Sequence, residues 1–369
     1  MIRVSLPARI NIVGSPTDAV EGAYATISAA VALRGGADIE PAQSIELCRR
    51  GGRSATFAKA AISEHHGFAL ETAAINALLR FAPELGAQLS RRGFALNTWT
   101  DVPASSGLAG SSVLLIAVLA ALRAFYALDA RRYNDYVLAE IAQRAEEHDL
   151  GVVCGFADRY VPIFADVAYL SYHGKLWHAP LGEEPYVTYE KLGAHVPPLE
   201  LCVATTGVQR DSGSVHEPMR RRYLEERRRG RGSLLELSRQ LGETAWRGKI
   251  ALLDGDLVAF GKQIDRNQKL IDDMMRDCGF TGGAGEEVNC LVAAARQAGA
   301  LGAKLTGAGG GGAIFALAQS GLASAMADRL REAATRAGLK GSEAFVLPVT
   351  TRGLVVEHAD QQTSMTPTD

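Results

Sequence analysis

The spacing of apolar residues predicts a mixture of strands and helices in the first half of the chain. Apolar and polar residues alternate over 7–13 and end at a Gly/Pro turn, which is typical of a strand followed by a shaped loop. Helical spacing over 63–82 and 132–148 predicts two helices. The run 113–122 is apolar throughout, which indicates a buried helix after the strand-like segment 93–99. We therefore expect a first domain of the α+β class.

A second domain is predicted to follow Pro197 and Pro198. Before that boundary, the segment 160–172 is strand-like. Beyond it, several segments have helical spacing, and a glycine loop leads into a strand. The segments with helical spacing are 214–229, 234–247, 257–275, 287–298 and 321–337. We assign residues 1–196 to the first domain and 197–356 to the second, and we expect residues 357–369 to form a frayed polar tail.

Composition and charge narrow the classes of partner. The 369 residues are 47% hydrophobic, and the net charge of -2 gives no reason to expect nucleic acid or an anionic membrane as a partner. The apolar run 113–122 is half as long as the roughly 20 residues that span a bilayer. The five cysteines are scattered without a CxxC pair, which argues against a disulfide framework or a structural zinc site. We expect a cytoplasmic protein, monomeric or homodimeric, with small molecules as its partners.

The segment 103–112, Pro-Ala-Ser-Ser-Gly-Leu-Ala-Gly-Ser-Ser, joins a predicted strand to the buried helix. Backbone N–H groups at a helix start have no partner within the helix, and the helix dipole adds partial positive charge there. A turn of small residues at that point is therefore a site for an anion, most often a phosphate. An ordinary loop capped by Ser111 or Ser112 is the alternative.

Three glycine-rich or Pro/Gly-bounded loops, 7–18, 103–112 and 305–312, together resemble the signature motifs of the GHMP kinases. This superfamily contains galactokinase, homoserine kinase, mevalonate kinase and phosphomevalonate kinase. The loops are similar to its P-x-R/K-x-N-L-x-G…D, P-x-x-x-G-L-x-x-S-S and K-x-T-G-x-G-x-G-G patterns, and residues 155–159 fall where the family has G-x-x-D. The resemblance implies an N-terminal α/β domain, a ferredoxin-like C-terminal domain and an active site between them, with ATP and Mg²⁺ as cofactors.

The resemblance also implies roles for individual residues. Asp158 would be the catalytic base, and Arg9 would stabilise the transferring charge, unless Arg9 forms only a structural ion pair. Mg²⁺ would be held by Ser111 or otherwise Ser112, and by Glu147 or otherwise Glu146, although a solvated helix end is an alternative for the glutamates. The residues expected to bind ATP are Pro103, Ser105, Ser106, Gly107, Leu108, Ala109, Gly110, Ser111 and Ser112.

The acceptor would lie on the other side of these residues. The expected substrate-binding residues are Asp18, His216, Gly307, Gly309 and Gly310. Asp18 would bond a sugar hydroxyl, although it could instead cap its own turn. Lys304 is expected to be solvated, and so is the arginine-rich segment 220–231, for which guidance of anionic substrates is the alternative.

Shorter matches favour one branch of the superfamily. Gly-Leu-Ala-Gly-Ser-Ser at 107–112 and Gly-Ser-Pro-Thr-Asp at 14–18 are similar to glucuronokinase-type sugar kinases. The implied reaction is direct in-line transfer of the γ-phosphate to a sugar hydroxyl, most simply the anomeric hydroxyl of a sugar or uronic acid. Ala157 stands where that branch has glutamine, which puts the identity of the sugar in doubt. Kinases of heptose phosphate or mevalonate type, or a ligand sensor that has lost catalysis, are the alternatives.

Overall fold

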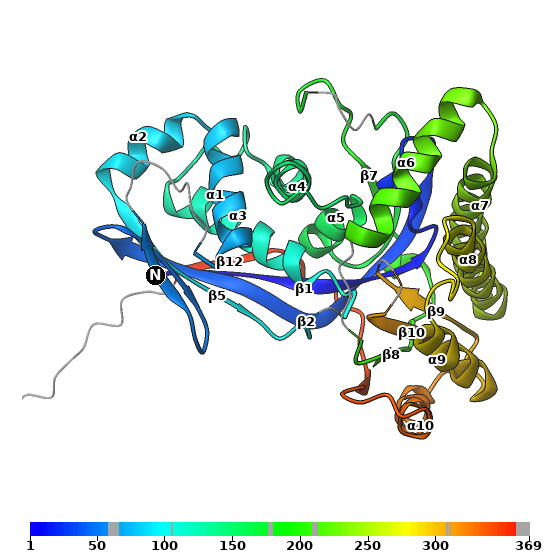
Figure 1. Ribbon diagram of the computed structural model, residues 1–369. Coiled ribbons are helices and arrows are strands. Elements are labelled where there is room, and N and C mark those ends of the chain that lie inside the picture. Colours follow the sequence, from blue (N-terminus) through cyan, green and yellow to red (C-terminus); the bar gives the residue numbers. More distant parts are fainter. Residues whose placement is uncertain are drawn as a thin grey trace, which may run out of the picture.

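The computed structural model describes residues 1–57, 66–104, 106–175, 180–208, 213–307, 309 and 311–358. Within these residues the chain forms two sheets, each covered by helices (Figure 1). No described helix combines the length and the apolar character that crossing a bilayer requires.

The larger sheet has eight strands, in the order β12-β1-β2-β5-β3-β4, with β6 pairing with β2 and β7 pairing with β6. One of its faces is covered by helices (Figure 1). The strands are β1 (Ile2–Val13), β2 (Ala25–Ala42), β3 (Ile45–Arg49), β4 (Ser54–Phe57), β5 (Gly93–Thr100), β6 (Val167–Ser171), β7 (Thr188–Lys191) and β12 (Val355–His358). The helices are α1 (Ala69–Phe81), α2 (Glu84–Arg91), α3 (Gly110–Phe125), α4 (Asp135–Arg144) and α5 (Ala157–Phe164), with a π-helical turn (Ala145–Asp149) after α4 and a short 3₁₀ turn (Thr17–Ala19) after β1.

The smaller sheet has four antiparallel strands in the order β11-β8-β10-β9. Because β8, β9, β10 and β11 follow one another in the chain with helices after the first and third, this is the ferredoxin-like arrangement that was expected. The strands are β8 (Leu201–Thr205), β9 (Gly302–Thr306), β10 (Ala313–Leu317) and β11 (Ala344–Val346). The helices are α6 (Gly213–Arg229), α7 (Ser233–Leu253), α8 (Leu257–Asp277), α9 (Glu286–Gln297) and α10 (Ala323–Arg336), and a 3₁₀ turn (Gly193–His195) precedes β8.

The helix α3 explains the longest apolar run of the sequence. It packs against β1 and β2 on one side and against α1, α4 and α5 on the others. As a result, Val113 and residues 115–122 are buried, and Leu114 is half-buried. A helix that is apolar on all sides must be covered on all sides. Its N-terminus is thereby held in a fixed place at the end of the cleft between the two sheets.

Apolar side chains from both sheets meet in one shared core. Ile10 and Ile27 of the larger sheet belong to the same buried cluster as Val203 and Phe315 of the smaller sheet and Phe260 of α8. Since buried apolar area is the main stabilising term in protein folding, this cluster holds the two halves together. The loops that leave β1 and β9 are therefore brought to one place.

Two expected elements of the first domain differ from the structure. The strand predicted over 160–172 is only partly present, because residues 160–164 belong to the helix α5 and only Val167–Ser171 is extended. A short apolar run is compatible with either a buried strand or a buried helix, because periodicity cannot separate them over so few residues. The helix predicted over 63–82 begins at Ala69, and residues 58–65 lie outside the described residues.

The predicted end of the second domain is also wrong. β12 pairs antiparallel with β1, with Ile2 opposite His358 and Ser5 opposite Val355, so the last described strand belongs to the first sheet. Glu357 and His358 are part of this strand, and residues 359–369 lie outside the described residues. The pairing gives the edge of β1 the hydrogen-bond partners that an unpaired strand edge would lack.

Candidate active site

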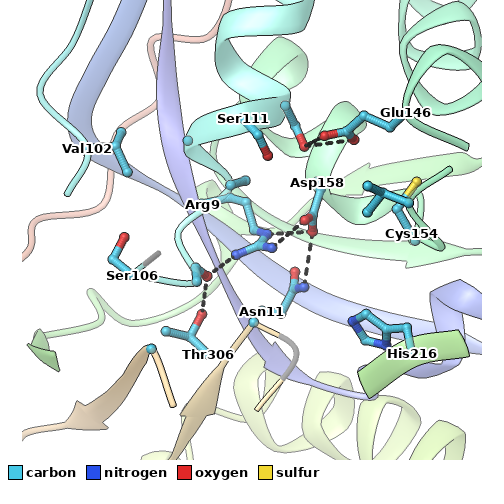
Figure 2. A pocket seen from close by; sticks show the side chains of 18 of the residues that line it. Arg9, Asn11, Val102, Ser106, Ser111, Glu146, Cys154, Asp158, His216 and Thr306 are labelled. Carbon is cyan, nitrogen blue, oxygen red and sulfur yellow. Dashed lines mark hydrogen bonds and ion pairs between the residues drawn. The ribbon is translucent and has the colours of Figure 1, made fainter. Parts of the chain in front are cut away.

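A cavity of about 570 Å³ opens where the glycine loops of the two halves meet. Its walls come from the end of β1, the loop that precedes α3, the segment before α5, the start of α6 and the loop between β9 and β10. Cavities of this size are typical of small-molecule sites. Asp158 lies in the middle, with Ser106 and Thr306 on one side and Cys154 and His216 on the other (Figure 2).

The helix start of α3 faces this cavity without a side-chain cap. Ala109 precedes the helix in the left-handed conformation with φ of 66°, and its side chain accepts no hydrogen bond. Gly110 and Ser111 line the cavity, and Ser112 donates to Glu146 instead of capping the helix. The first backbone N–H groups of α3 are therefore available to an anion.

Ser106 adds a second indication of a ligand in this loop. Its hydroxyl is buried and has no hydrogen-bond partner among the described residues, although the residue lines the cavity. A buried hydroxyl without a partner costs free energy, and a bound phosphate oxygen would satisfy it. The predicted ATP-binding residues Pro103, Gly107 and Ala109 also line the cavity, Leu108 is buried beneath them, and Ser105 lies outside the described residues.

Two of the glycine loops contact each other backbone to backbone. Gly107 has a φ of 68°, and a Cβ atom there would overlap the carbonyl oxygen of Thr306. A Cβ atom on Gly307, whose φ is 87°, would lie 2.7 Å from the Cα of Gly107. The Thr306 hydroxyl also donates to the Gly107 carbonyl at 3.1 Å. The absence of side chains is thus required at this junction, which joins the loop before α3 to the loop after β9.

Asp158 and Arg9 form the central ion pair. The Arg9 Nε atom donates to Asp158 Oδ1 at 2.7 Å, and Arg9 Nη2 lies 2.5 Å from Asp158 Oδ2. Arg9 Nη1 donates to the Gly107 carbonyl at 2.5 Å, and Asn11 Nδ2 lies 3.4 Å from Asp158 Oδ1. The Arg9 side chain is 3% exposed and that of Asp158 is 23% exposed, so the carboxylate is the member of the pair that a ligand reaches.

Asp18 is buried next to this pair. Its Oδ2 atom accepts the backbone N–H of Ala157 at 3.1 Å, in the first turn of α5. A Cβ atom on Gly155 would overlap the same carboxylate, so the segment before α5 needs glycine to approach Asp18. Burial, reinforced by the Asp158 carboxylate, raises the pKa of Asp18 to about 6. Asp18 thus bonds the neighbouring segment and also lines the cavity.

The structure brings Glu146, and not Glu147, into the cavity. The Ser112 hydroxyl lies 3.2 Å from Glu146 Oε2, and Glu146 is also paired with Arg159. Glu147 faces the other way and is paired with Arg220. The π-helical turn at Ala145–Asp149 decides which of the two adjacent glutamates faces α3. Glu146 with Ser112, which were the alternatives in the sequence analysis, therefore suit a metal better than Glu147, which was expected first. Ser111, the serine expected first, also lines the cavity.

Lys304 is not solvated, and this prediction is wrong. The side chain is completely buried, and Nζ donates to the carbonyls of Asn11 at 3.1 Å and of Leu305 at 2.7 Å. Burial, reinforced by the charge of Arg9, lowers the pKa of Lys304 to about 7. The residue links β9 of the smaller sheet to β1 of the larger sheet through the Asn11 carbonyl.

Of the remaining predicted acceptor residues, only His216 is found on the side of Cys154 among the residues labelled in Figure 2. His216, near the start of α6, lines the cavity, and burial lowers its pKa to about 4, so it is neutral at pH 7. Gly307 and Gly309 line the opposite wall, and Gly310 lies outside the described residues.

The sequence reasoning missed the roles of Asn11, Arg159 and Thr306. Asn11 stands at the asparagine of the first motif, and Arg159 directly follows Asp158, so both could have been found from the motifs. The arginine-rich segment was expected to be solvated, which is wrong for Arg220, because that side chain is 13% exposed and paired.

Two family models match the chain in regions that contain much of this site. The model of the GHMP kinases N terminal domain matches residues 70–166, and the model of the GHMP kinases C terminal domain matches residues 249–336. Together the two matches cover about half of the chain.

Relatives with similar sequences include a galactokinase and a probable glucuronokinase. A galactokinase from Thermococcus kodakarensis is 27% identical over an alignment that covers 94% of this chain and 97% of that protein. Probable glucuronokinase 2 from Arabidopsis thaliana is 31% identical, over 64% of this chain and 60% of that protein.

Solved structures have the same fold. The galactokinase of Lactococcus lactis complexed with galactose has a TM-score of 0.76 and 19% identity, and the match covers 96% of this chain and 95% of that one. The mevalonate kinase of Methanococcus jannaschii has a TM-score of 0.68 and 18% identity, over 95% of this chain and 98% of that one. At these identities the likeness establishes the fold alone.

Proposed function

The chain belongs to the GHMP kinase superfamily, and we propose that it transfers the γ-phosphate of ATP to a hydroxyl of a sugar, the anomeric hydroxyl of a hexose or uronic acid. The observation that carries this proposal is the position of Asp158. Its carboxylate opens into the same cavity as the uncapped start of α3. A group that accepts a proton and a group that holds a phosphate chain are thereby directed at one space.

The phosphates of ATP fit the loop before α3. The backbone N–H groups of the helix start, and the Ser106 hydroxyl that has no partner among the described residues, are donors for phosphate oxygens. The cavity continues past this loop to Leu70, Val102 and Leu114, and an apolar end of this kind suits the nucleotide base. ATP would therefore lie along the loop with its terminal phosphate toward Asp158.

The transfer itself requires positioning and charge compensation more than covalent chemistry. Asp158 would accept the proton of the acceptor hydroxyl or orient that hydroxyl toward the γ-phosphate. Arg9 holds both oxygens of Asp158 in place and brings positive charge to the point where negative charge develops. We propose a direct in-line displacement, without a covalent phosphoenzyme.

The residues beside the phosphate loop fit a magnesium ion. Mg²⁺ prefers hard oxygen ligands and usually takes one or two from protein carboxylates, with phosphates and waters supplying the others. The Glu146 carboxylate and the Ser112 hydroxyl, with Ser111 at the cavity wall, offer such oxygens. When bound there, the ion would neutralise charge on the phosphates. Arg159 balances the charge of Glu146 and keeps this carboxylate in place.

The acceptor would occupy the side of the cavity formed by Asp18, Cys154 and His216. Asp18 and His216 can bond sugar hydroxyls, and Gly307 and Gly309 leave room on the opposite wall. Of the described residues that line the cavity, the arginines are Arg9 and Arg159, and each is already paired with a carboxylate. This pairing favours a neutral hexose over a uronic acid, whose carboxylate calls for a cation.

A panel of acceptors tests the proposal. The purified chain would be incubated with ATP, Mg²⁺ and one acceptor at a time, and ADP release would be measured. The acceptors are D-galactose, D-glucuronic acid, a heptose phosphate and mevalonate. Phosphorylation of galactose or glucuronic acid supports a sugar kinase. Activity confined to the heptose phosphate or to mevalonate would show that the proposed sugar acceptor is wrong. Binding of a ligand without turnover of any of the four acceptors would favour a sensor.

A further inference from the structure

The helix α6 presents one face to the acceptor side of the cavity. His216, Arg220, Tyr223 and Arg227 follow one another at intervals of four, three and four residues, so their side chains lie along one side of the helix. His216 lines the cavity, and the other three bind backbone or side chains of the first half of the chain. We infer that Arg220 is a positioning residue that sets the shape of the acceptor site, an inference that rests on the proposed kinase function.

Arg220 reaches three separate segments of the chain with one guanidinium. Its Nε donates to the Ala19 carbonyl at 2.8 Å, its Nη2 donates to the Cys154 carbonyl at 3.0 Å, and its Nη1 is paired with Glu147. Both side chains of the ion pair are largely buried, at 13% and 14% exposure. Glu147 is held in turn by Gln143, whose Nε2 lies 2.5 Å away. The planar guanidinium carries five N–H donors in a fixed arrangement, and these contacts use all three of its nitrogens.

The two carbonyls that Arg220 binds belong to the acceptor wall. Ala19 directly follows Asp18, and Cys154 directly precedes Gly155, which touches the Asp18 carboxylate. Ala19 and Cys154 both line the cavity. Arg220 therefore closes the space between α6 and the two segments that position Asp18. The bonds from Arg220 to the Ala19 and Cys154 carbonyls lie on the acceptor side, so we expect its removal to disturb the acceptor side more than the phosphate side.

Further contacts along α6 hold the helix in this position. The Tyr223 hydroxyl donates to the Glu21 carbonyl at 2.5 Å. The Tyr24 hydroxyl lies 2.9 Å from the Tyr223 hydroxyl and donates to it, because the Tyr223 proton is already used. Arg227 forms an ion pair with Glu21 at 2.6 Å. These bonds fix the far end of the helix, so a change at Arg220 would loosen the cavity wall without releasing α6 as a whole.

Arg220→Met and Arg220→Lys test this inference, with Arg221→Gln as the matched control. Arg221 is exposed and belongs to the same arginine run, so its replacement changes charge without touching the wall. With D-galactose or D-glucuronic acid as the acceptor, we expect Arg220→Met to raise the acceptor KM by about tenfold while the KM for ATP changes less than about twofold. The acceptor KM of Arg220→Lys should lie between those of the unaltered protein and Arg220→Met, since one ammonium group cannot reach all three partners.

Hydrogen exchange gives a second readout that needs no substrate. In Arg220→Met, amides of 17–24 and 151–156 should exchange faster, whereas amides of 106–114 should match the unaltered protein and Arg221→Gln. Equal changes in both KM values, an unchanged acceptor KM, or faster exchange throughout the chain would overturn the inference. If the unaltered protein phosphorylates neither sugar, the proposed function fails, and the exchange pattern still decides whether Arg220 holds the wall.

Discussion

The guanidinium of Arg9 and the carboxylate of Asp158 form a two-point ion pair between residues that are 149 positions apart in the sequence. Arg9 lies within β1 and Asp158 in the first turn of α5, and the pair is completed by the Gly107 carbonyl, which accepts from Arg9. One arginine therefore connects the strand, the helix and the loop before α3. The pair places the proposed base beside the proposed phosphate site.

Replacing this base should separate chemistry from nucleotide binding. We expect Asp158→Asn to lower kcat by about 100-fold or more, because the amide cannot accept the hydroxyl proton, while ATP binding measured by calorimetry stays within about threefold. Asp254→Asn, at an exposed position, is the control for a generic loss of an acidic side chain. Full turnover in Asp158→Asn would remove Asp158 from the mechanism.

A methyl group at the junction of the two glycine loops should damage the phosphate site. We expect Gly107→Ala to weaken ATP binding by more than about tenfold and to lower the melting temperature, because the new Cβ would overlap the Thr306 carbonyl. Gly338→Ala is the matched control, since Gly338 also has a φ of 68° but has no atom within 4 Å of the added Cβ. The control reports the backbone strain alone, about 1 kcal/mol. Equal effects of the two variants would contradict the junction.

The two neighbouring glutamates should respond differently to magnesium. We expect Glu146→Gln to raise the Mg²⁺ concentration for half-maximal activity by about tenfold, because it removes the proposed carboxylate ligand beside Ser112. Glu147→Gln should leave the Mg²⁺ requirement unchanged. Titrations of activity against Mg²⁺ at saturating ATP measure the difference.

Melting curves accompany the magnesium titrations, because Glu146→Gln also leaves the buried Arg159 without its partner. If only Glu147→Gln shifts the Mg²⁺ requirement, Glu147 is the metal ligand, as the sequence analysis first expected.

Asp18 should make stability depend on pH. Burial raises the pKa of its carboxyl to about 6 in the folded chain, against about 4 for an unfolded aspartate. Between about pH 4 and pH 6 the folded chain keeps a proton that the unfolded chain has lost, so the free energy of unfolding falls as the pH rises through this window. Above about pH 6 the full loss, on the order of 3 kcal/mol, persists.

Asp18→Asn should lack this dependence. Urea unfolding at pH 4.5, 5.5 and 7.5 should show the unaltered protein losing stability relative to Asp18→Asn as the pH rises. Asp158, Arg9 and Arg159 are the charged groups that act on Asp18, and all three remain in the variant. Parallel stability curves for the two proteins would show that the Asp18 carboxyl titrates at its ordinary pKa.

Much of the site could be read from residue types in order. The loop 103–112 was identified because its chemistry is local, since small residues at a helix start expose N–H groups. The roles of Arg9 and Asp158 came instead from their places in motifs that resemble those of the family. The apolar run that became α3 was also evident, since a helix covered on all sides needs apolar residues throughout. The ferredoxin-like arrangement of the second domain was implied by the family resemblance and is confirmed.

Tertiary structure decided the features that depend on direction and on distant partners. Glu146 and Glu147 are identical in type, and only the π-helical turn determines which one faces Ser112. Lys304 and Arg220 are cationic, and the sequence predicts that both are solvated. In the structure both side chains are largely buried, and each donates to a carbonyl of a remote segment.

The same reason explains the return of β12 to β1. Residue type and local spacing, which the sequence carries, determine which chemistry is present. The side on which a group lies, and the partner that satisfies it, depend on packing between segments that are hundreds of residues apart.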